Sequence, residues 1–216
     1  WKFSDLSQII SSNIKDLNFY NNLPLEKVNK AIFIDKFKHN KIVFVNGAIS
    51  NIDLSYEDET KVSLSRNLDF NESCNETNPL ISLNNAFASG YIGITVKESY
   101  SFKCPLIIYN ITNNALKSTA LNIRTDIILE KNSNLKLITL FDDSSGGNFI
   151  NIVQNFDIAK DAILKNYKVD HKINSNIKYF YNNINLEKNS ISENFIFSTG
   201  SKFIKNEVNC NLNDQF

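Results

Sequence analysis

The chain has 216 residues, a formal net charge of +0 at pH 7 and 42% hydrophobic residues. Global disorder is excluded, because this composition supplies enough apolar surface for a core. A dedicated nucleic-acid binder is also excluded, because it needs an excess of Lys and Arg that the chain lacks. The apolar stretches are strand-length and fall short of the roughly 20 residues of a membrane helix, so we expect no membrane segment.

Residues 1–30 are predicted to form an N-terminal helical segment. Apolar side chains recur at the i, i+3 and i+4 intervals of one helical face, and the Leu23-Pro24 step ends the pattern. This helical face is made by Phe3, Leu6, Ile9, Ile10, Ile14 and Leu17.

Residues 31–79 are predicted to be mixed strands around the Asn46-Gly47 turn, followed by an exposed polar loop over 53–78.

Residues 80–216 carry an internal repeat with steps of 26 to 29 residues between predicted strand starts. One series of strands starts at Ile92, Leu121, Ile150, Ile177 and Phe203, and the other at Leu106, Leu135, Ile163 and Ile191. Polar corners recur with the same period and carry a lysine at the corresponding position, namely Lys131, Lys160 and Lys188. Units of two strands and two corners cannot bury an apolar side alone, so they must stack. The sequence therefore predicts a mostly β parallel β-helix; an antiparallel sandwich is the competing architecture.

The alternation within strands predicts which side chains point into the solenoid. Ile92, Ile94 and Val96 are expected to point inward. Ile150 and Ile152 should do the same on either side of an outward Asn151. We further expect one inward column through Leu135, Ile163 and Ile191, and an inward Cys210 between Val208 and Leu212.

Candidate chemical groups are few, and the sequence predicts a protein that is not an enzyme. Phosphate-cradling loops and hydrolase motifs are absent from the sequence. The polar stretch 142–148 is interpreted as a solvated turn, and His171 follows Asp170 as a weak candidate ligand or base. The weak metal candidates are Cys104, Cys210 and His171. Because a cluster normally needs about four converging ligands, we expect none to be bound by this chain alone.

Several passages resemble SufD proteins of the SufB/SufD family, in the right order over nearly the whole chain. Lys205 stands where that family usually has Arg. The passages are Trp1-Lys2-Phe3-Ser4-Asp5-Leu6, Val43-Phe44-Val45-Asn46-Gly47, Leu83-Asn84-Asn85-Ala86-Phe87, Gly90-Tyr91-Ile92-Gly93-Ile94, Pro105 to Ile111, Arg124 to Glu130, and Thr199 to Leu212.

The resemblance implies a right-handed parallel β-helix and a non-catalytic scaffold subunit of the SUF iron–sulfur cluster assembly complex. It further implies a SufB-like scaffold and a SufC-like ATPase as partners, and a cluster held only transiently in the full complex. Family members are longer, so we expect this chain to be truncated inside its solenoid. The SufC-docking helices and a His-bearing rim would follow Phe216. An open solenoid end predicts self-association.

The expected compartment is the bacterial cytosol, with a plastid-type organelle as the alternative. Three widely spaced cysteines and no CxxC pair fit a reducing environment. Two other functions remain open at this point. A carbohydrate-active or adhesive β-helix would need clustered carboxylates and basic groups, yet Arg66 and Arg124 are the only arginines. A metal-binding protein using Cys74 together with the three weak candidates would carry stoichiometric iron.

Overall fold

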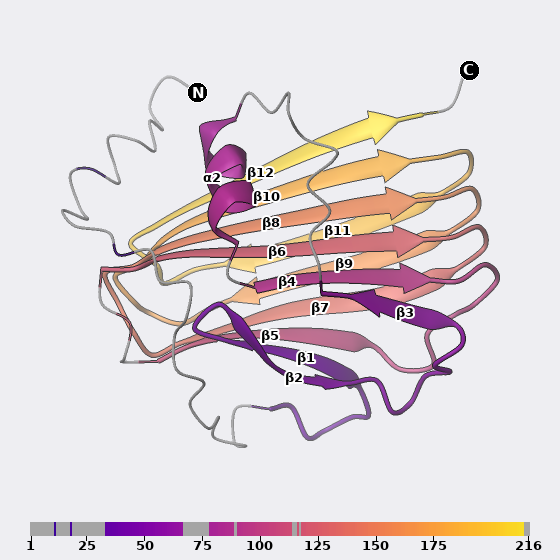
Figure 1. The fold of residues 1–216 in the computed structure, drawn as a ribbon, viewed down its shortest axis with the longest axis horizontal. Helices are drawn as coiled ribbons and strands as arrows, with labels where there is room; N and C mark the ends of the chain where they lie inside the picture. Colours follow the sequence, from indigo (N-terminus) through magenta and orange to yellow (C-terminus); the bar gives the residue numbers. More distant parts are fainter. Residues whose placement is uncertain are drawn as a thin grey trace.

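The computed structural model describes residues 11, 18, 33–66, 78–88, 90–113, 116 and 118–213. This part is mostly β and forms a parallel β-solenoid of about four turns, with one short helix (Figure 1). The predicted fold class is therefore confirmed. The predicted N-terminal helix, the Trp1–Leu6 passage and Cys74 lie outside the described residues.

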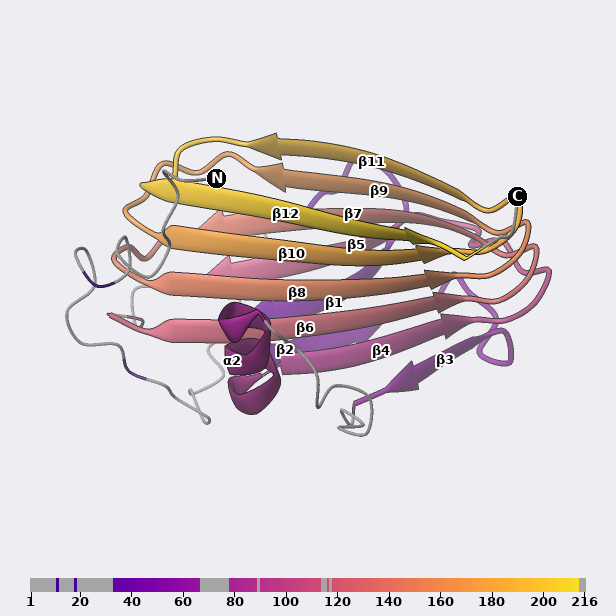
Figure 2. The same ribbon diagram turned by 90° about the horizontal axis from the view of Figure 1, so that it is seen from above.

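Two six-stranded sheets face each other across the interior (Figure 2). Sheet 1 has the order β12-β10-β8-β6-β4-β3, and sheet 2 has the order β11-β9-β7-β5-β1-β2. The strands of sheet 1 are β3 (Val62–Ser65), β4 (Gly90–Val96), β6 (Ala120–Leu129), β8 (Phe149–Ile158), β10 (Ile177–Leu186) and β12 (Phe203–Leu212). The strands of sheet 2 are β1 (Asn40–Val45), β2 (Ala48–Asp53), β5 (Leu106–Thr112), β7 (Asn134–Asp143), β9 (Ile163–Asp170) and β11 (Ile191–Ser198).

The chain alternates between the sheets from β4 onward and winds in a right-handed sense. In Figure 1 it runs to the right along sheet 1 in front, returns to the left along sheet 2 behind, and rises by one coil each time. Neighbouring strands from successive coils pair in parallel. Right-handed crossovers are the rule for parallel strands in one sheet, because they follow from strand twist.

The predicted strand starts agree with the structure within two residues, but one predicted column is wrong. Ile163 pairs with Ile191, whereas Leu135 pairs with Leu164. Leu135 and Leu164 are fully buried, while Ile163 is half-buried and Ile191 is 46% exposed. The prediction fails because a one-residue error in register reverses the face on which a side chain lies.

The apolar core fills the space between the sheets. Ile92, Ile94 and Val96 on β4 point inward as predicted and are at most 1% exposed. Ile150 and Ile152 on β8 belong to the same cluster. Each coil thus adds aliphatic side chains to columns that run along the solenoid, and each buried side chain contributes roughly 1.5–3 kcal/mol.

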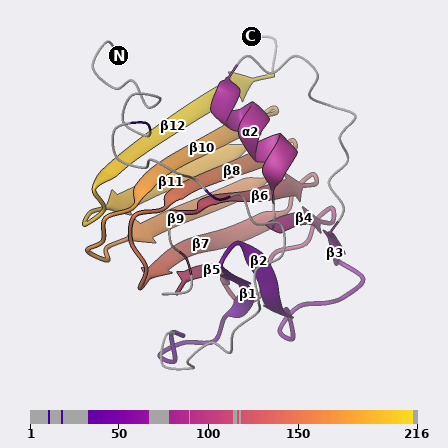
Figure 3. The same ribbon diagram turned by 60° about the vertical axis from the view of Figure 1, so that its left-hand side comes forward.

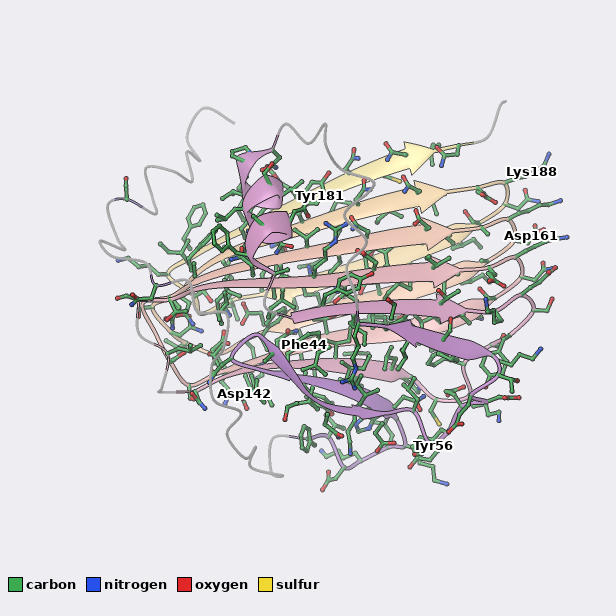
Figure 4. All side chains as sticks on the ribbon, viewed as in Figure 1. Phe44, Tyr56, Asp142, Asp161, Tyr181 and Lys188 are labelled. Carbon is green, nitrogen blue, oxygen red and sulfur yellow. The ribbon has the colours of Figure 1, made fainter. Side chains whose placement is uncertain are left out.

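The corners at the right of Figure 1, between sheet 1 and sheet 2, repeat the same backbone geometry. Asn132, Asp161 and Asn189 all have positive φ, at 58°, 60° and 56°. Asn and Asp tolerate this left-handed conformation better than other non-glycine residues. Asp161 donates its N–H to Lys188 O at 3.0 Å, and Figure 4 shows both residues at this end of the solenoid. The recurring polar corners of the sequence are therefore one stacked structural feature.

The first strands of each sheet form antiparallel edges. β1 and β2 are joined by Asn46 and Gly47, whose φ values of 49° and 85° fit a tight hairpin turn. β3 pairs antiparallel with β4. The prediction of a continuous exposed loop over 53–78 is thus wrong at Val62–Ser65. A four-residue strand at the edge of a sheet, with one buried side chain, shows little apolar alternation in the sequence.

Helix α2 (Pro79–Phe87) lies on the outer side of sheet 1 (Figure 3). The Asn78 side chain caps it by accepting from Leu80 N at 3.0 Å. Asn84 Nδ2 donates to Ile123 O at 3.1 Å and to Asn151 O at 3.0 Å. Asn151 Nδ2 donates to Leu80 O of the helix at 2.8 Å. Asn151 therefore points outward as predicted, yet it is fully buried because the helix covers it.

Candidate functional site: a buried polar cluster inside the solenoid

The three weak metal candidates lie on different elements and do not converge. Cys104 precedes β5, His171 follows β9 at the opposite end of sheet 2, and Cys210 lies on β12 of sheet 1. Over the ranges that the structure describes, no group of three His, Cys, Asp or Glu residues is placed to hold a metal ion. Cys104 N instead donates to Glu57 Oε1 at 3.1 Å, a carboxylate that also accepts from Tyr100 OH at 2.8 Å.

Cys210 is exposed, so its predicted place in the core is wrong. It lies in register with Ile184, which is buried in the core of the preceding coil. Parallel pairing keeps side chains of matched residues on the same face, so Cys210 does point to the inward side. Val208 and Leu212 beside it are 53% and 63% exposed, since no described strand lies above β12.

The chemically distinctive region is a polar part of the interior, which we call the buried polar cluster. Inward positions on β7, β9 and β10 that would be aliphatic in an ordinary core are occupied by charged and amide side chains. All of them are at most 5% exposed. The buried polar cluster consists of Asp143, Asp170, Lys168, Lys178 and Asn182.

Lys178 is the centre of this cluster and pairs with two carboxylates from sheet 2. Its Nζ lies 2.8 Å from Asp170 Oδ2 and also contacts Asp143 Oδ2. All three side chains are at most 1% exposed. Removing such charges from water is costly, and their mutual attraction offsets the cost only while all partners are present. Burial raises the pKa of Asp170, although the charge of Lys178 acts in the opposite direction.

Lys168 is the second buried lysine and has no carboxylate in contact. Its Nζ donates to Asn182 Oδ1 at 3.3 Å and lies 4.5 Å from the centre of the Phe180 ring. Burial lowers the pKa of Lys168 to about 7, and the charge of Asp170 only partly opposes this. Removal from water thus favours the uncharged form of this amine.

The stretch 142–148 extends the cluster and is only in part the predicted solvated turn, because Ser144 and Gly146 are exposed whereas other members are buried. Asp143 and Ser145 are 5% exposed and Asn148 is fully buried. Thr112 Oγ1 donates to Asp143 Oδ1 at 2.9 Å. Asn148 Oδ1 accepts from Thr119 N at 3.0 Å, so the turn side chains tie successive coils together. Hydrogen bonding between coils, which sequence composition does not reveal, turns these polar residues inward.

This arrangement can hold charge and protons inside the solenoid, but its two lysines are fully buried and cannot meet a substrate in solution. The sequence contained one usable signal for it. Lys168, Asp170, Lys178 and Asn182 fall at positions whose spacing from the strand starts is that of inward residues. Recognising them required the correct register, which the repeat alone left uncertain by one residue.

A groove on the outside of the solenoid contains His171. It is lined by Tyr109, Ile111, Leu140, Asp142 and Lys172 among others, and Figure 4 places Asp142 at the left end of the coils. Lys172 Nζ lies 3.3 Å from Asp142 Oδ1. His171 thus borders a surface groove and does not join Cys104 or Cys210.

In the described ranges, no helix has the length and apolar character needed to span a membrane.

The chain matches a protein-family model. Residues 110–216 match the family model described as "SUF system FeS cluster assembly, SufBD core domain". The matched region runs from within β5 to the end of the chain and includes the whole buried polar cluster. No curated protein matches the chain.

Proposed function

Because this chain belongs to the SufB/SufD family and takes part in iron–sulfur cluster assembly by the SUF system, we propose that it is a non-catalytic, SufD-like scaffold subunit of the SUF complex. The single observation that carries the proposal is the family match over the coils β6 to β12, which the structure describes as one continuous solenoid. A stiff stack of paired strands is suited to presenting surfaces to neighbouring subunits.

The proposed partners are a SufB-like scaffold and a SufC-like ATPase. The nascent iron–sulfur cluster is cargo of the assembled complex and not a resident group of this chain. This is consistent with the separation of Cys104, Cys210 and His171. The proposed compartment is the bacterial cytosol or a plastid-type organelle, where thiols stay reduced.

A non-catalytic role is supported by where the titratable groups lie. Lys168 and Asp170, two groups whose pKa values are shifted mainly by burial, are enclosed by the two sheets. Arg124, one of the two arginines, contacts Asp126 at 3.1 Å and also Asn85 of α2. Such an engaged guanidinium gives no support to a carbohydrate-binding groove.

The test is co-expression of the full-length protein with SufB and SufC, followed by size-exclusion chromatography. The expected result is one peak containing all three chains, with ATP hydrolysis that disappears when SufC is omitted. Elution of this protein alone, under conditions in which SufB and SufC are folded, would overturn the proposal. ATP hydrolysis by this protein alone would contradict the non-catalytic role.

A further inference from the structure

The outward side of sheet 2 carries an apolar band two side chains wide. Ile138, Tyr167 and Phe195 lie in register on β7, β9 and β11, and so do Leu140, Val169 and Phe197. Their positions alternate with those of the core residues, so they point away from the interior. We call these six residues the apolar band.

The lower end of the band is already covered by the chain itself. There the columns continue to Ile107 and Tyr109, which are at most 2% exposed. Phe33 packs edge-on against Tyr109 with ring centroids 4.9 Å apart, and Ile34 N donates to Tyr109 OH at 3.1 Å. Further up, Tyr167, Phe195 and Phe197 are 37%, 55% and 47% exposed.

Stacking a further coil on β11 would not remove this exposure. Such a coil would cover the backbone edge and the inward side chains of β11 and would add side chains beside Phe195 and Phe197, but it would leave the outer face of the band open. Contiguous exposed aromatic and aliphatic side chains on a rigid sheet are typical of protein contact surfaces. The band is therefore a surface feature of the sheet, whether or not another coil stacks on β11 and β12.

Charges beside the band favour an acidic partner. Lys136 and Lys165 lie side by side in register on neighbouring strands, where like charges repel. Lys165 Nζ is 2.9 Å from Glu193 Oε2, and this pair leaves Lys136, which is exposed, as an excess positive charge. A carboxylate from a partner would relieve this repulsion.

Helix α2 shows how a helix sits on the outer face of this solenoid. Its cap residue Asn78 contacts Tyr179 on β10, Leu80 O accepts from Asn151 on β8, and Asn84 reaches Ile123 on β6. The helix thus descends the coils along the solenoid axis. This is geometrically favourable because a helical turn rises about 5.4 Å, close to the roughly 4.8 Å between strands.

We propose that the apolar band is the docking site for an amphipathic helix of a protein partner, running along the solenoid axis as α2 does on sheet 1. Its apolar side chains, one per turn, contact β7, β9 and β11 in succession. Acidic side chains on its flank lie against Lys136 and Lys165. The bound helix continues the cover that Phe33 and Ile34 begin.

The test measures binding of a fluorescein-labelled, helix-forming peptide with Leu at i, i+4, i+7 and i+11 and Glu on the one flank that would face Lys136 and Lys165, by fluorescence anisotropy. The intact protein is expected to bind it. The double variant Phe195→Ser/Phe197→Ser should weaken binding by about tenfold or more, because aromatic contacts dominate such interfaces. Lys136→Glu should weaken it as well. The matched control Leu64→Ser removes an exposed apolar side chain on β3 and should leave binding unchanged.

Several outcomes overturn the proposal. Absence of binding does so, as does equal binding of an isomeric peptide with its Leu residues dispersed around the helix. If the wild-type protein dimerises and the Phe195→Ser/Phe197→Ser variant is monomeric, the band is a contact between copies. If wild type but not this variant binds phosphatidylglycerol vesicles, the band is a lipid contact. An unchanged thermal melt of the double variant establishes that it remains folded.

Discussion

Inside the solenoid, the region near the right-hand corners of Figure 1 and the region near the left-hand corners have different chemistry. We call these regions the two ends of the interior. Toward the right of Figure 1, one inward column stays apolar through four coils, from Ile94 through Ile127 and Phe156 to Ile184. Toward the left, Leu121 and Ile150 are followed in the same column by Lys178. Parallel stacking places like residues on like residues by default, so a charge that enters a column must find partners across the interior.

The two ends therefore depend on separate kinds of interaction. The apolar end is stabilised by burial of each side chain, and these contributions accumulate coil by coil. The polar end depends on a closed set of contacts among Lys178, Asp143 and Asp170, in which the loss of one member leaves the others unpaired. Substitutions at each end should separate the two kinds of interaction.

The largest effect is expected from Ile152→Asp. Ile152 is 2% exposed and belongs to the apolar core, so an introduced carboxylate has no partner. We expect a loss of several kcal/mol of stability and unfolding at ambient temperature, measured by circular dichroism melts. Asn183→Asp places the same charge on an outward, half-exposed position of β10 and should melt like wild type. Equal melting of both variants would contradict the inward assignment.

Lys178→Met should destabilise the fold by about 3–5 kcal/mol, because it leaves Asp143 and Asp170 buried without their counter-charge. The measurement is the midpoint of urea denaturation at pH 7. The triple variant Asp143→Leu/Asp170→Leu/Lys178→Met removes all three charges and should regain most of the loss. A single variant as stable as wild type would show that the cluster contributes nothing to the fold.

Lys168→Met tests whether burial lowers the pKa of Lys168 in the folded protein. Folding lowers the pKa of Lys168 from 10.5 to about 7, so between these values the unfolded chain binds more protons than the native one. The free energy of unfolding should then rise by a few kcal/mol as the pH increases from 7 toward 10. Below pH 7 the titration of Lys168 should contribute no further change. The variant should lack this rise in urea midpoints. Lys188→Met, at an exposed corner, should retain it, and a wild-type-like slope in Lys168→Met would refute the assignment.

Asn84→Ala should give the smallest effect, about 1–3 kcal/mol, because it removes two hydrogen bonds from α2 to the sheet. Local loosening of α2 is best followed by hydrogen exchange of amides in β6 and β8 beneath it. Ser82→Ala, at an exposed position on the same helix, is the matched control. Exchange that is unchanged beneath α2 in the Asn84 variant would show that apolar contacts alone hold the helix.

Much of the fold could be predicted from periodicity, because each coil of a solenoid repeats the same pattern of strands and corners along the sequence. The strand starts at Leu106, Ile163, Ile177 and Phe203 were predicted at the residues where strands begin. Register was less certain, since alternation has a period of two and a single polar residue at a strand start shifts it, as at Asn134. Helix α2 was missed because its short apolar face gives little signal.

The buried polar cluster was not predicted, for a physical reason. Lys168 and Lys178 are hydrophilic by type, so composition assigns them to the surface. Their burial depends on contacts between residues in different coils, such as Lys178 with Asp143 and Asp170. Such contacts are set by the three-dimensional stack, and the inward spacing of these residues can be recognised only when the register of the strands is known.

The corners described above bear on how such a protein changes over evolutionary time. On one side the connections 130–133, 159–162 and 187–190 have the same length and interlock through Asn132, Asp161 and Asn189. On the other side, 144–148, 171–176 and 199–202 differ in length. Single-residue insertions are therefore tolerable on only one flank of the molecule. Gain or loss of a complete repeat preserves both flanks, so lineages of this architecture are expected to diverge by duplicating or deleting entire windings.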